Sequence, residues 1–152
     1  MNGLDNGGNE MLLDMKLEKG APLPKHAQPG DAGIDLTTRE DATIYPHTTK
    51  MLPTGVHAAI PRGYVGLCIS RSGIATKKGL VLANGVGVID SGYRGEIMAP
   101  LHNISHKPQE VKAGERICQM VILPFMPVTC RDNDSLDETE RGADGFGSTG
   151  EL

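Results

Sequence analysis

The sequence predicts an all-β protein of one domain, on three observations. Its 152 residues suffice for a single domain with a modest core. From Met11 onward, short apolar runs are separated by Gly, Pro, Asn and Asp, and little of the chain follows a helical period. Twenty glycines and ten prolines supply the breaks between these runs. Many short runs of this kind are typical of a β-sandwich, a jelly roll or a small barrel.

Eight of these runs are candidate strands. MLLDMKLE, GIDLTT and ATIY are short and end at Gly, Pro or charged residues, and MLPTGVHAAI stops at a proline. YVGLCIS has a branched aliphatic residue at every second position, as expected of a strand. LVLANGVGVI, EIMAPLHNI and ICQMVILPFMPV are long apolar runs, and a short helical turn is expected only within SGIATKKGL. In chain order the expected strands are residues 11–18, 33–38, 42–45, 51–60, 64–70, 80–89, 96–104 and 117–128.

Both ends of the chain differ from the middle in composition. Residues 1–10, MNGLDNGGNE, are rich in Gly and Asn, and we expect a disordered extension. After Cys130 the sequence is acidic, rich in Gly and nearly free of aliphatic side chains, which is typical of a mobile arm. The expected organisation is a β-domain over residues 11–130 and a flexible arm over residues 131–152.

The composition also excludes some classes of function. Fifteen basic and nineteen acidic residues give a net charge of −4, so nothing draws the whole chain toward nucleic acid or an anionic membrane. No apolar run approaches the ~18 residues of a membrane span, and the first ten residues do not resemble a signal peptide. Three cysteines without CxxC spacing indicate buried thiols in the cytosol or the nucleus. With no Trp, three Tyr and two Phe, burial shared with partner subunits is expected.

The stretch ANGVGVIDSGYRGE, residues 83–96, places an aspartate on a glycine-rich corner. Asp90 follows an apolar run and precedes Tyr93 by three residues. A turn explains part of this pattern, because Gly and Asp favour turns. It leaves the tyrosine unexplained, and both residues are candidates for chemistry.

Another stretch, SRSGIATKKG, offers groups that suit phosphate. Arg71, Ser72 and Gly73 would supply a guanidinium fork, a hydroxyl and free backbone N–H groups. A solvated turn explains the same residues. The stretch is a weak signal taken alone.

Two candidate strands carry polar residues among aliphatic ones. Asp35 in AGIDL follows a glycine and alternates with Ile34 and Leu36, although a solvent-facing aspartate explains it equally well. Arg116 and Gln119 open the apolar strand of GERICQMV, where both could be edge residues. An amide within such a run needs a hydrogen-bond partner.

GFGSTG, residues 145–150, matches the G-x-G-x-x-G pattern but lacks its context. A dinucleotide-binding turn follows a strand and opens a helix, which this tail does not. Composition alone favours a disordered linker. Phe146 between two glycines instead favours an arm that folds over a nucleobase, since base–aromatic stacking is worth ~1–3 kcal/mol.

The sequence contains no HExxH, no Cys/His cluster and no GxxxxGK[ST] loop. A hard divalent ion would therefore take oxygen ligands, mostly from phosphates of the substrate and from water.

Taken in order, five stretches resemble the five motifs of the trimeric dUTP pyrophosphatases (dUTPases). The resemblance begins at about Met11 and keeps the order and spacing of the motifs, so the set is far more specific than any one of them. It implies a jelly-roll-like distorted β-barrel, a homotrimer, and hydrolysis of dUTP to dUMP and pyrophosphate with Mg²⁺. This reaction keeps uracil out of DNA and supplies dUMP for thymidylate synthesis. The motifs are DAGIDL (31–36), SRSG (70–73), ANGVGVIDSGYRGE (83–96), GERICQMV (114–121) and RGADGFGSTG (141–150).

The resemblance implies that the third motif binds the nucleoside and holds the reacting water. Asp90 would be the general base for attack on the α-phosphorus, a weak base at neutral pH, so that positioning and charge neutralisation supply most of the rate. Tyr93 would pack under the deoxyribose and exclude a 2′-OH. Asn84 would read uracil together with backbone groups of Gly85 and Gly87, in a hairpin too narrow for the methyl group of thymine.

The other motifs would hold the metal and the phosphates. Asp35 would hold the hydration shell of Mg²⁺ indirectly. In the arm, Arg141 would clamp the γ-phosphate and Phe146 would cap the uracil, closing a site to which three subunits contribute. Phosphate contacts are implied for Arg71, Ser72, Gly73, Gln119, Arg141, Gly147, Ser148 and Thr149.

One departure and two alternatives remain open. Ser70 stands where the second motif commonly has proline, and we expect a looser turn with Arg71 still in place. The related dCTP deaminases share the trimeric fold and use a glutamate, for which Glu96 and Glu115 are available. A non-catalytic nucleotide-binding module would be free to lose Asp90. The glycine-rich arm and the DSGYRGE hairpin favour the pyrophosphatase.

Overall fold

A computed structural model describes residues 11–145, which form twelve β-strands and one short helix. The all-β prediction is confirmed, and every pair of neighbouring strands is antiparallel. The elements in chain order are β1 (Met15–Leu17), β2 (Lys25–His26), β3 (Ile34–Thr37), β4 (Ala42–Ile44), β5 (Thr49–Pro53), β6 (Val56–Ala58), β7 (Tyr64–Ser70), α1 (Ser72–Lys78), β8 (Leu80–Leu82), β9 (Val86–Ile89), β10 (Met98–Asn103), β11 (Gln109–Val111) and β12 (Arg116–Pro124).

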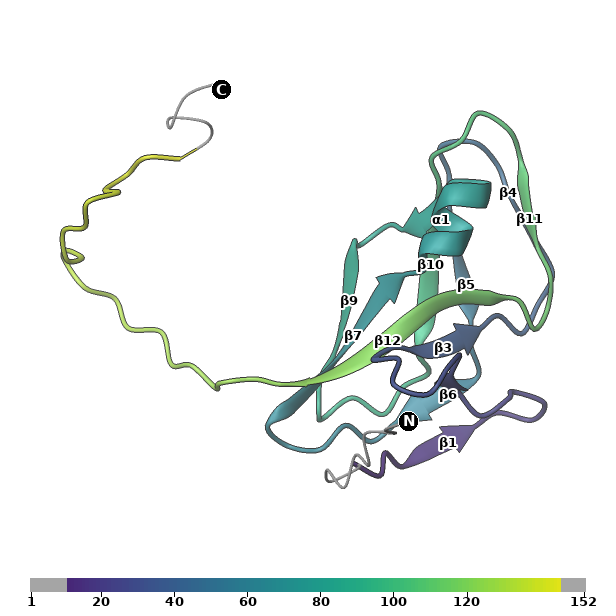
Figure 1. The fold of residues 1–152 in the computed structure, drawn as a ribbon, viewed down its shortest axis with the longest axis horizontal. Helices are drawn as coiled ribbons and strands as arrows, with labels where there is room; N and C mark the ends of the chain where they lie inside the picture. Colours follow the sequence, from purple (N-terminus) through teal and green to yellow (C-terminus); the bar gives the residue numbers. More distant parts are fainter. Residues whose placement is uncertain (1–10, 146–152) are drawn as a thin grey trace, which may run out of the picture.

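The strands form small sheets around one interior (Figure 1). The largest has the order β2-β3-β12-β7-β9, the second has the order β5-β10-β8, and β1-β6 and β11-β4 are separate pairs. Buried side chains from all four sheets belong to one hydrophobic cluster, which includes Leu36, Ile44, Leu52, Val56 and Leu101. Within the described range this buried cluster contains no Phe or Tyr, in agreement with the aromatic-poor composition.

Two of the expected strands are interrupted by turns. Residues 51–60 divide into β5 and β6 because Gly55 adopts a φ of 72° and the buried Thr54 hydroxyl donates to the Ile97 carbonyl at 2.6 Å. Residues 80–89 divide into β8 and β9 at a turn that contains Asn84 and Gly85. Strand β7 has the predicted bounds, and the expected helical turn is α1.

The last expected strand, 117–128, ends earlier than its apolar character suggests. Strand β12 stops at Pro124, and the Phe125 N–H donates to the Gly63 carbonyl at 3.0 Å. Residues 125–145 then run away from the body without strand or helix (Figure 1), and Met126 and Val128 are each 82% exposed. No helix within residues 11–145 has the length and apolar character needed to cross a membrane.

Candidate active site

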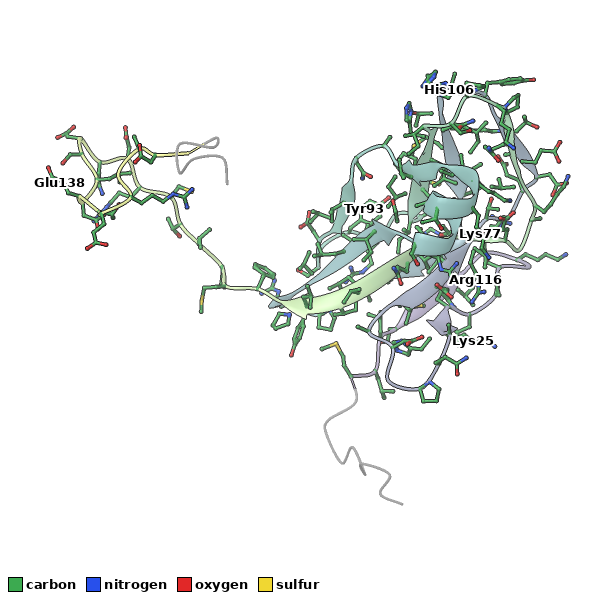
Figure 2. The ribbon with its side chains drawn as sticks, turned by 45° about the horizontal axis from the view of Figure 1, so that its top comes forward. Lys25, Lys77, Tyr93, His106, Arg116 and Glu138 are labelled. Carbon is green, nitrogen blue, oxygen red and sulfur yellow. The ribbon has the colours of Figure 1, made fainter. Side chains whose placement is uncertain are left out.

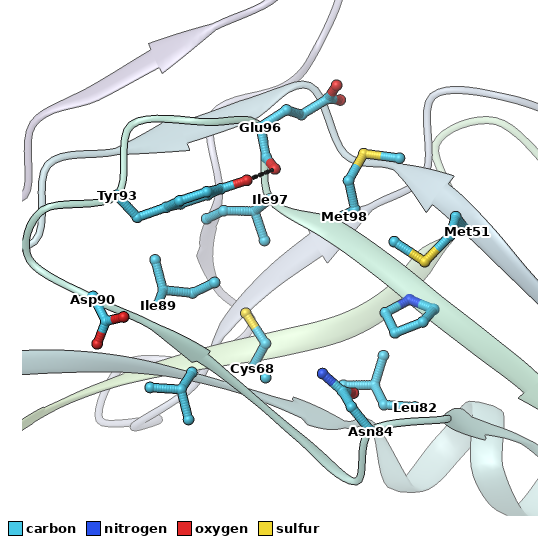
Figure 3. Close-up of a pocket in the computed structure, with 13 residues that line it drawn as sticks. Met51, Cys68, Leu82, Asn84, Ile89, Asp90, Tyr93, Glu96, Ile97 and Met98 are labelled. Atoms are coloured by element: carbon cyan, nitrogen blue, oxygen red, sulfur yellow. Dashed lines mark hydrogen bonds between the residues drawn. The ribbon is translucent and has the colours of Figure 1, made fainter.

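A cavity of about 310 Å³ opens beside the turn between β8 and β9 (Figure 3). Four of the predicted site residues line it: Asn84, Gly87, Asp90 and Tyr93. The remaining wall is largely apolar and includes side chains from β5, β7 and β10. A mostly apolar pocket with a few convergent polar groups is typical of a small-molecule site.

The turn between β8 and β9 sets the position of Asn84. The Gly85 N–H donates to the Leu82 carbonyl at 3.0 Å, and Gly85 has a φ of 68°, which favours glycine. Gly87 faces the amide, since a Cβ there would lie 3.3 Å from Nδ2 of Asn84. Asn84 therefore lies in the turn itself. The sequence had suggested a place within the strand of residues 80–89.

A second turn presents Asp90 and Tyr93. The Tyr93 N–H donates to the Asp90 carbonyl at 3.0 Å, and the Tyr93 hydroxyl donates to the Glu96 carbonyl at 2.8 Å. The ring lies against Gly95, where a Cβ would be 2.6 Å from Cζ of Tyr93. Asp90 is exposed at the cavity rim, where a bound ligand and a water molecule can both reach its carboxylate.

The floor of this cavity includes a cysteine, Cys68, whose thiol is not poised to act as a nucleophile. Burial raises the pKa of the Cys68 thiol to about 11, so it stays protonated near neutral pH. Cys68 therefore contributes to the apolar floor of the cavity.

A second cavity, of about 420 Å³, is strongly basic. It is lined by the predicted residues Arg71, Ser72 and Gly73, and by Lys77 and Arg116. Figure 2 shows Lys77 and Arg116 on the same side of the body. Lys78 also lines it, with its charge partly engaged by Glu115 at 2.5 Å. Such a concentration of cationic groups suits a polyphosphate.

Asp35 joins two of these cations. Its carboxylate accepts from Arg71 Nε at 2.6 Å and from Arg116 Nη1 at 3.1 Å, while its side chain is only 11% exposed. The strand order brings the three together, because β12 lies between β3 and β7. A nearly buried carboxylate needs such partners, and it orients both guanidinium groups. Arg116 is thus a site residue that sequence reasoning left as an edge position.

Gln119 lies beside Asp35 and lines neither of these two cavities. The two residues are paired across β12 and β3, and the Gln119 amide donates to the Ser70 carbonyl at 3.4 Å. Its side chain fits because residue 33 is glycine: a Cβ there would lie 2.5 Å from Oε1 of Gln119. The hydrogen-bond partner expected for this amide is therefore the Ser70 carbonyl, at the end of β7 next to Arg71.

Comparison with known proteins decides the family. A sequence model of the dUTPase family matches residues 19–150. The chain belongs to the dUTPase family. This result confirms the resemblance drawn from the five motifs.

Individual dUTPases agree over most of the chain. The deoxyuridine 5′-triphosphate nucleotidohydrolase of Desulfitobacterium hafniense is 48% identical over 139 residues, covering 90% of this chain and 92% of that protein. The enzyme of the same name from Cutibacterium acnes is 46% identical over 129 residues, covering 84% of this chain and 85% of that protein.

Solved structures of dUTPases share the fold. That of the Staphylococcus bacteriophage 80alpha dUTPase with dUPNHPP has a TM-score of 0.84 at 30% identity, covering 91% of this chain and 98% of that one. The dUTPase of Streptococcus mutans has a TM-score of 0.70 at 34% identity, covering 76% of this chain and 98% of that one. The predicted jelly-roll-like β fold is therefore confirmed.

In this dUTPase, Ser70 has a structural task that the sequence did not reveal. Its hydroxyl oxygen accepts from the Leu82 N–H at 2.8 Å and so ties the end of β7 to β8. The turn holds Arg71 against Asp35, as expected. Proline at this position would lack the acceptor that Ser70 supplies to β8.

Of the predicted arm residues, Arg141 is within the described range and lines neither cavity. Arg141 is exposed, and its Nε donates to the Asp144 carbonyl at 3.0 Å. Phe146, Gly147, Ser148 and Thr149 lie outside the described residues.

The donor set also bears on the metal, since dUTPases generally depend on a divalent ion. Among residues 11–145 no group of three or more His, Cys, Asp or Glu side chains is arranged to hold one. Both oxygens of Asp35 already accept hydrogen bonds from arginines. These residues fit an ion that brings its own phosphate and water ligands.

Proposed function

We propose that this chain hydrolyses dUTP to dUMP and pyrophosphate. The observation that carries the proposal is the convergence of Asn84, Gly87, Asp90 and Tyr93 on one cavity beside β9 and the turns at its two ends. That set combines an amide, close backbone, an aromatic ring and a carboxylate. Together they match the base, the sugar and the reacting water of one nucleotide.

The nucleoside binds in the cavity beside the β8–β9 turn. The Asn84 side chain and the backbone near Gly85 and Gly87 bind the uracil edge, and the tight turn leaves no room for the methyl group of thymine. The Tyr93 ring packs under the deoxyribose and excludes a 2′-OH. Its hydroxyl is directed away to Glu96, so the ring face is the surface offered to the sugar.

Asp90 holds the reacting water and takes its proton as the water oxygen attacks the α-phosphorus. Pyrophosphate leaves as the bond to the bridging oxygen breaks. Arg71, Ser72, Gly73 and Gln119 bind the phosphate oxygens and stabilise the charge that develops on them. Mg²⁺, when bound to the phosphates, supplies further charge neutralisation, and Asp35 meets its hydration shell.

We further propose a homotrimer whose sites are shared between subunits. The cavity beside the β8–β9 turn and the basic cavity of one chain have no lining residue in common, although one nucleotide needs both. The apolar side chains of Val88, Leu123 and Phe125 are 60%, 42% and 49% exposed, as expected of surfaces that a neighbour covers. Residues 131–152 form the arm that closes a neighbour's site, with Arg141 on the γ-phosphate, Phe146 on the uracil, and Gly147, Ser148 and Thr149 around the phosphates.

Three free cysteines, two of them buried, fit a reducing compartment, and we place the enzyme in the cytoplasm. There it would remove dUTP from the nucleotide pool and supply dUMP.

The decisive experiment measures pyrophosphate release, with Mg²⁺, from dUTP, dCTP, dTTP and UTP offered separately. Release from dUTP alone is expected. Asp90→Asn should keep nucleotide binding and lose about 10²- to 10⁴-fold in kcat, the usual contribution of a general base. Asp14→Asn, at an exposed carboxylate outside both cavities, is the matched control.

Two results would contradict the proposal. Full turnover by Asp90→Asn would remove the base from the mechanism. Deamination of dCTP without pyrophosphate release would assign the chain's chemistry to the deaminase branch instead.

A further inference from the structure

His57 on β6 contacts an acceptor through each of its ring nitrogens. Nδ1 lies 2.9 Å from the Arg94 carbonyl oxygen, and Nε2 lies 3.0 Å from Oε1 of Glu18. The side chain is half-buried, at 17% exposure, so these contacts replace water at most of its surface. Its partners are 37 and 39 residues away in the sequence.

Both partners can only accept hydrogen bonds. A peptide carbonyl has no proton to give, and the carboxylate of Glu18 has none while it is ionised. The hydrogen bond with His57, and next the charge of Lys16, hold the pKa of Glu18 below its usual value, so it is ionised at neutral pH. A neutral imidazole has one N–H and serves one of the two partners, whereas the imidazolium donates to both.

The Arg94 carbonyl belongs to the segment that carries the candidate catalytic groups, residues 90–96. Inside this segment the bonds are local: Tyr93 N–H donates to the Asp90 carbonyl, and Arg94 Nη1 donates to the Ser91 and Tyr93 carbonyls. Its anchorage to the rest of the fold comes from β9 at its start, where Ile89 pairs with Gly66 of β7, and from β6 and the residue before it at its end. The Gly55 N–H donates to Oε1 of Glu96 at 2.6 Å.

The contact between His57 and Arg94 is the anchor on β6 that reaches this segment nearest to Asp90. The next residue after the segment is also held by β6, since the Ile97 N–H donates to the Val56 carbonyl at 2.8 Å. With His57 in place, the segment is fixed at Arg94, at Glu96 and at its exit. Without it, Asp90 is still held by the neighbouring β9, but the part of the segment that carries Tyr93 is next fixed only at Glu96.

We propose that protonated His57 is a positioning residue for hydrolysis, which fixes the segment carrying Asp90 and Tyr93 and makes their placement depend on pH. The inference rests on the proposed dUTP hydrolysis. The charged groups on the elements around His57 are Glu18 and Lys16, which is paired with His57 across β1 and β6, and Arg94 and Glu96 on the segment, whose side chains bond to the Ser91 and Tyr93 carbonyls and to the Gly55 N–H. Of these, Glu18 is the one whose charged group, the carboxylate, contacts a ring nitrogen of His57.

The test separates a charge effect from a purely structural one by means of Glu18→Gln. The new amide can donate to Nε2 of neutral His57, whose Nδ1–H then still reaches the Arg94 carbonyl. This variant should therefore retain activity and lose the pH dependence. In a pH series from about 5.5 to about 8.5, wild-type kcat/KM should fall relative to Glu18→Gln by about two- to tenfold, the range for one hydrogen bond.

Two more variants complete the experiment. His57→Gln cannot titrate and donates to one partner at a time, so its kcat/KM should be low and should track Glu18→Gln with pH. His102→Gln is the matched control, because His102 is also half-buried and also bonded through Nδ1, in this case to Thr49. It should follow the wild-type profile.

The protonation state is read independently by ¹⁵N NMR of the histidine rings across the same pH range. Two protonated ring nitrogens on His57 at the acidic end, with loss of one proton as wild-type kcat/KM falls, support the inference. A constant ratio of wild type to Glu18→Gln, or a His57 that is neutral throughout, would overturn it. If no variant hydrolyses dUTP, the proposed function fails, and the NMR titration still decides the state of His57.

Discussion

Replacing Gly95 with alanine tests whether the position of the Tyr93 ring sets the rate. A Cβ at residue 95 would lie 2.6 Å from Cζ and 2.9 Å from Cε2 of Tyr93, and closer still to its hydroxyl oxygen. Carbon atoms in contact are ordinarily ~3.5–4.0 Å apart, so the ring has to move by about 1 Å. Gly95 does not lie in the left-handed region, so the backbone itself accepts alanine.

The displacement should affect catalysis more than stability. Moving a substrate-positioning group by ~1 Å can cost ~10²-fold in rate, and we expect kcat/KM for dUTP to fall about 10- to 100-fold. The hydrogen bond from the Tyr93 hydroxyl to the Glu96 carbonyl is lost as well, which is worth ~0.5–1.5 kcal/mol of unfolding free energy. The ring is 43% exposed, so little buried area is lost with it.

The assay is pyrophosphate release from dUTP and from UTP, with urea denaturation alongside. Gly92→Ala is the control in the same turn, because a Cβ at Gly92 meets no atom within 4 Å. Gly95→Ala should also narrow the preference for dUTP over UTP, since the displaced ring no longer guards the 2′ position. Wild-type kcat/KM in Gly95→Ala, or an equal loss in Gly92→Ala, would refute the role given to the ring.

Three further changes test other parts of the site. Deleting residues 141–152 should cut turnover sharply and leave the trimer intact by sedimentation; retained turnover would exclude the arm from the site. Asp35→Asn removes the charge that orients Arg71 and Arg116, and should lower the unfolding free energy by about 2 kcal/mol and weaken dUTP binding. Iodoacetamide at mildly alkaline pH should label the exposed Cys130 and spare the buried Cys68 and Cys118. Burial raises the pKa of the Cys68 thiol to about 11 and also raises the pKa of Cys118. Rapid labelling of Cys68, detected by mass spectrometry, would contradict its burial.

The parts of the fold that could be predicted depend on neighbours in the sequence. Strand β7 has its predicted bounds because its alternation is uninterrupted, and α1 was visible as the one short run without strand character. The turn between β8 and β9 was missed because LVLANGVGVI is apolar on both sides of Asn84. Strands β2 and β11 were missed because two or three residues, mostly polar, carry no period.

Contacts between distant residues could not be predicted in the same way. Arg71 and Arg116 meet on Asp35 across 36 and 81 residues, and only the order of strands β3, β12 and β7 brings them together. The motifs supplied these residues one by one, without their mutual contacts. His57 lies in no motif, and nothing in MLPTGVHAAI indicates that its ring faces two acceptors.

The placement of residues 90–96 depends in part on elements that are distant in the sequence. A weak base on an exposed corner gains most of its effect from being held in place, so the anchors of residues 90–96 are part of the catalytic design. At the Asp90 end the anchor is β9, which pairs with β7. At the Tyr93 end the anchors come from Gly55 and β6, and among the described strands β6 pairs only with β1, over three residues. A short pair of this kind opens more readily than the central strands of the five-stranded sheet. Substitutions in β1 that leave the core intact should therefore lower kcat/KM through the Tyr93 end of this segment before they unfold the protein.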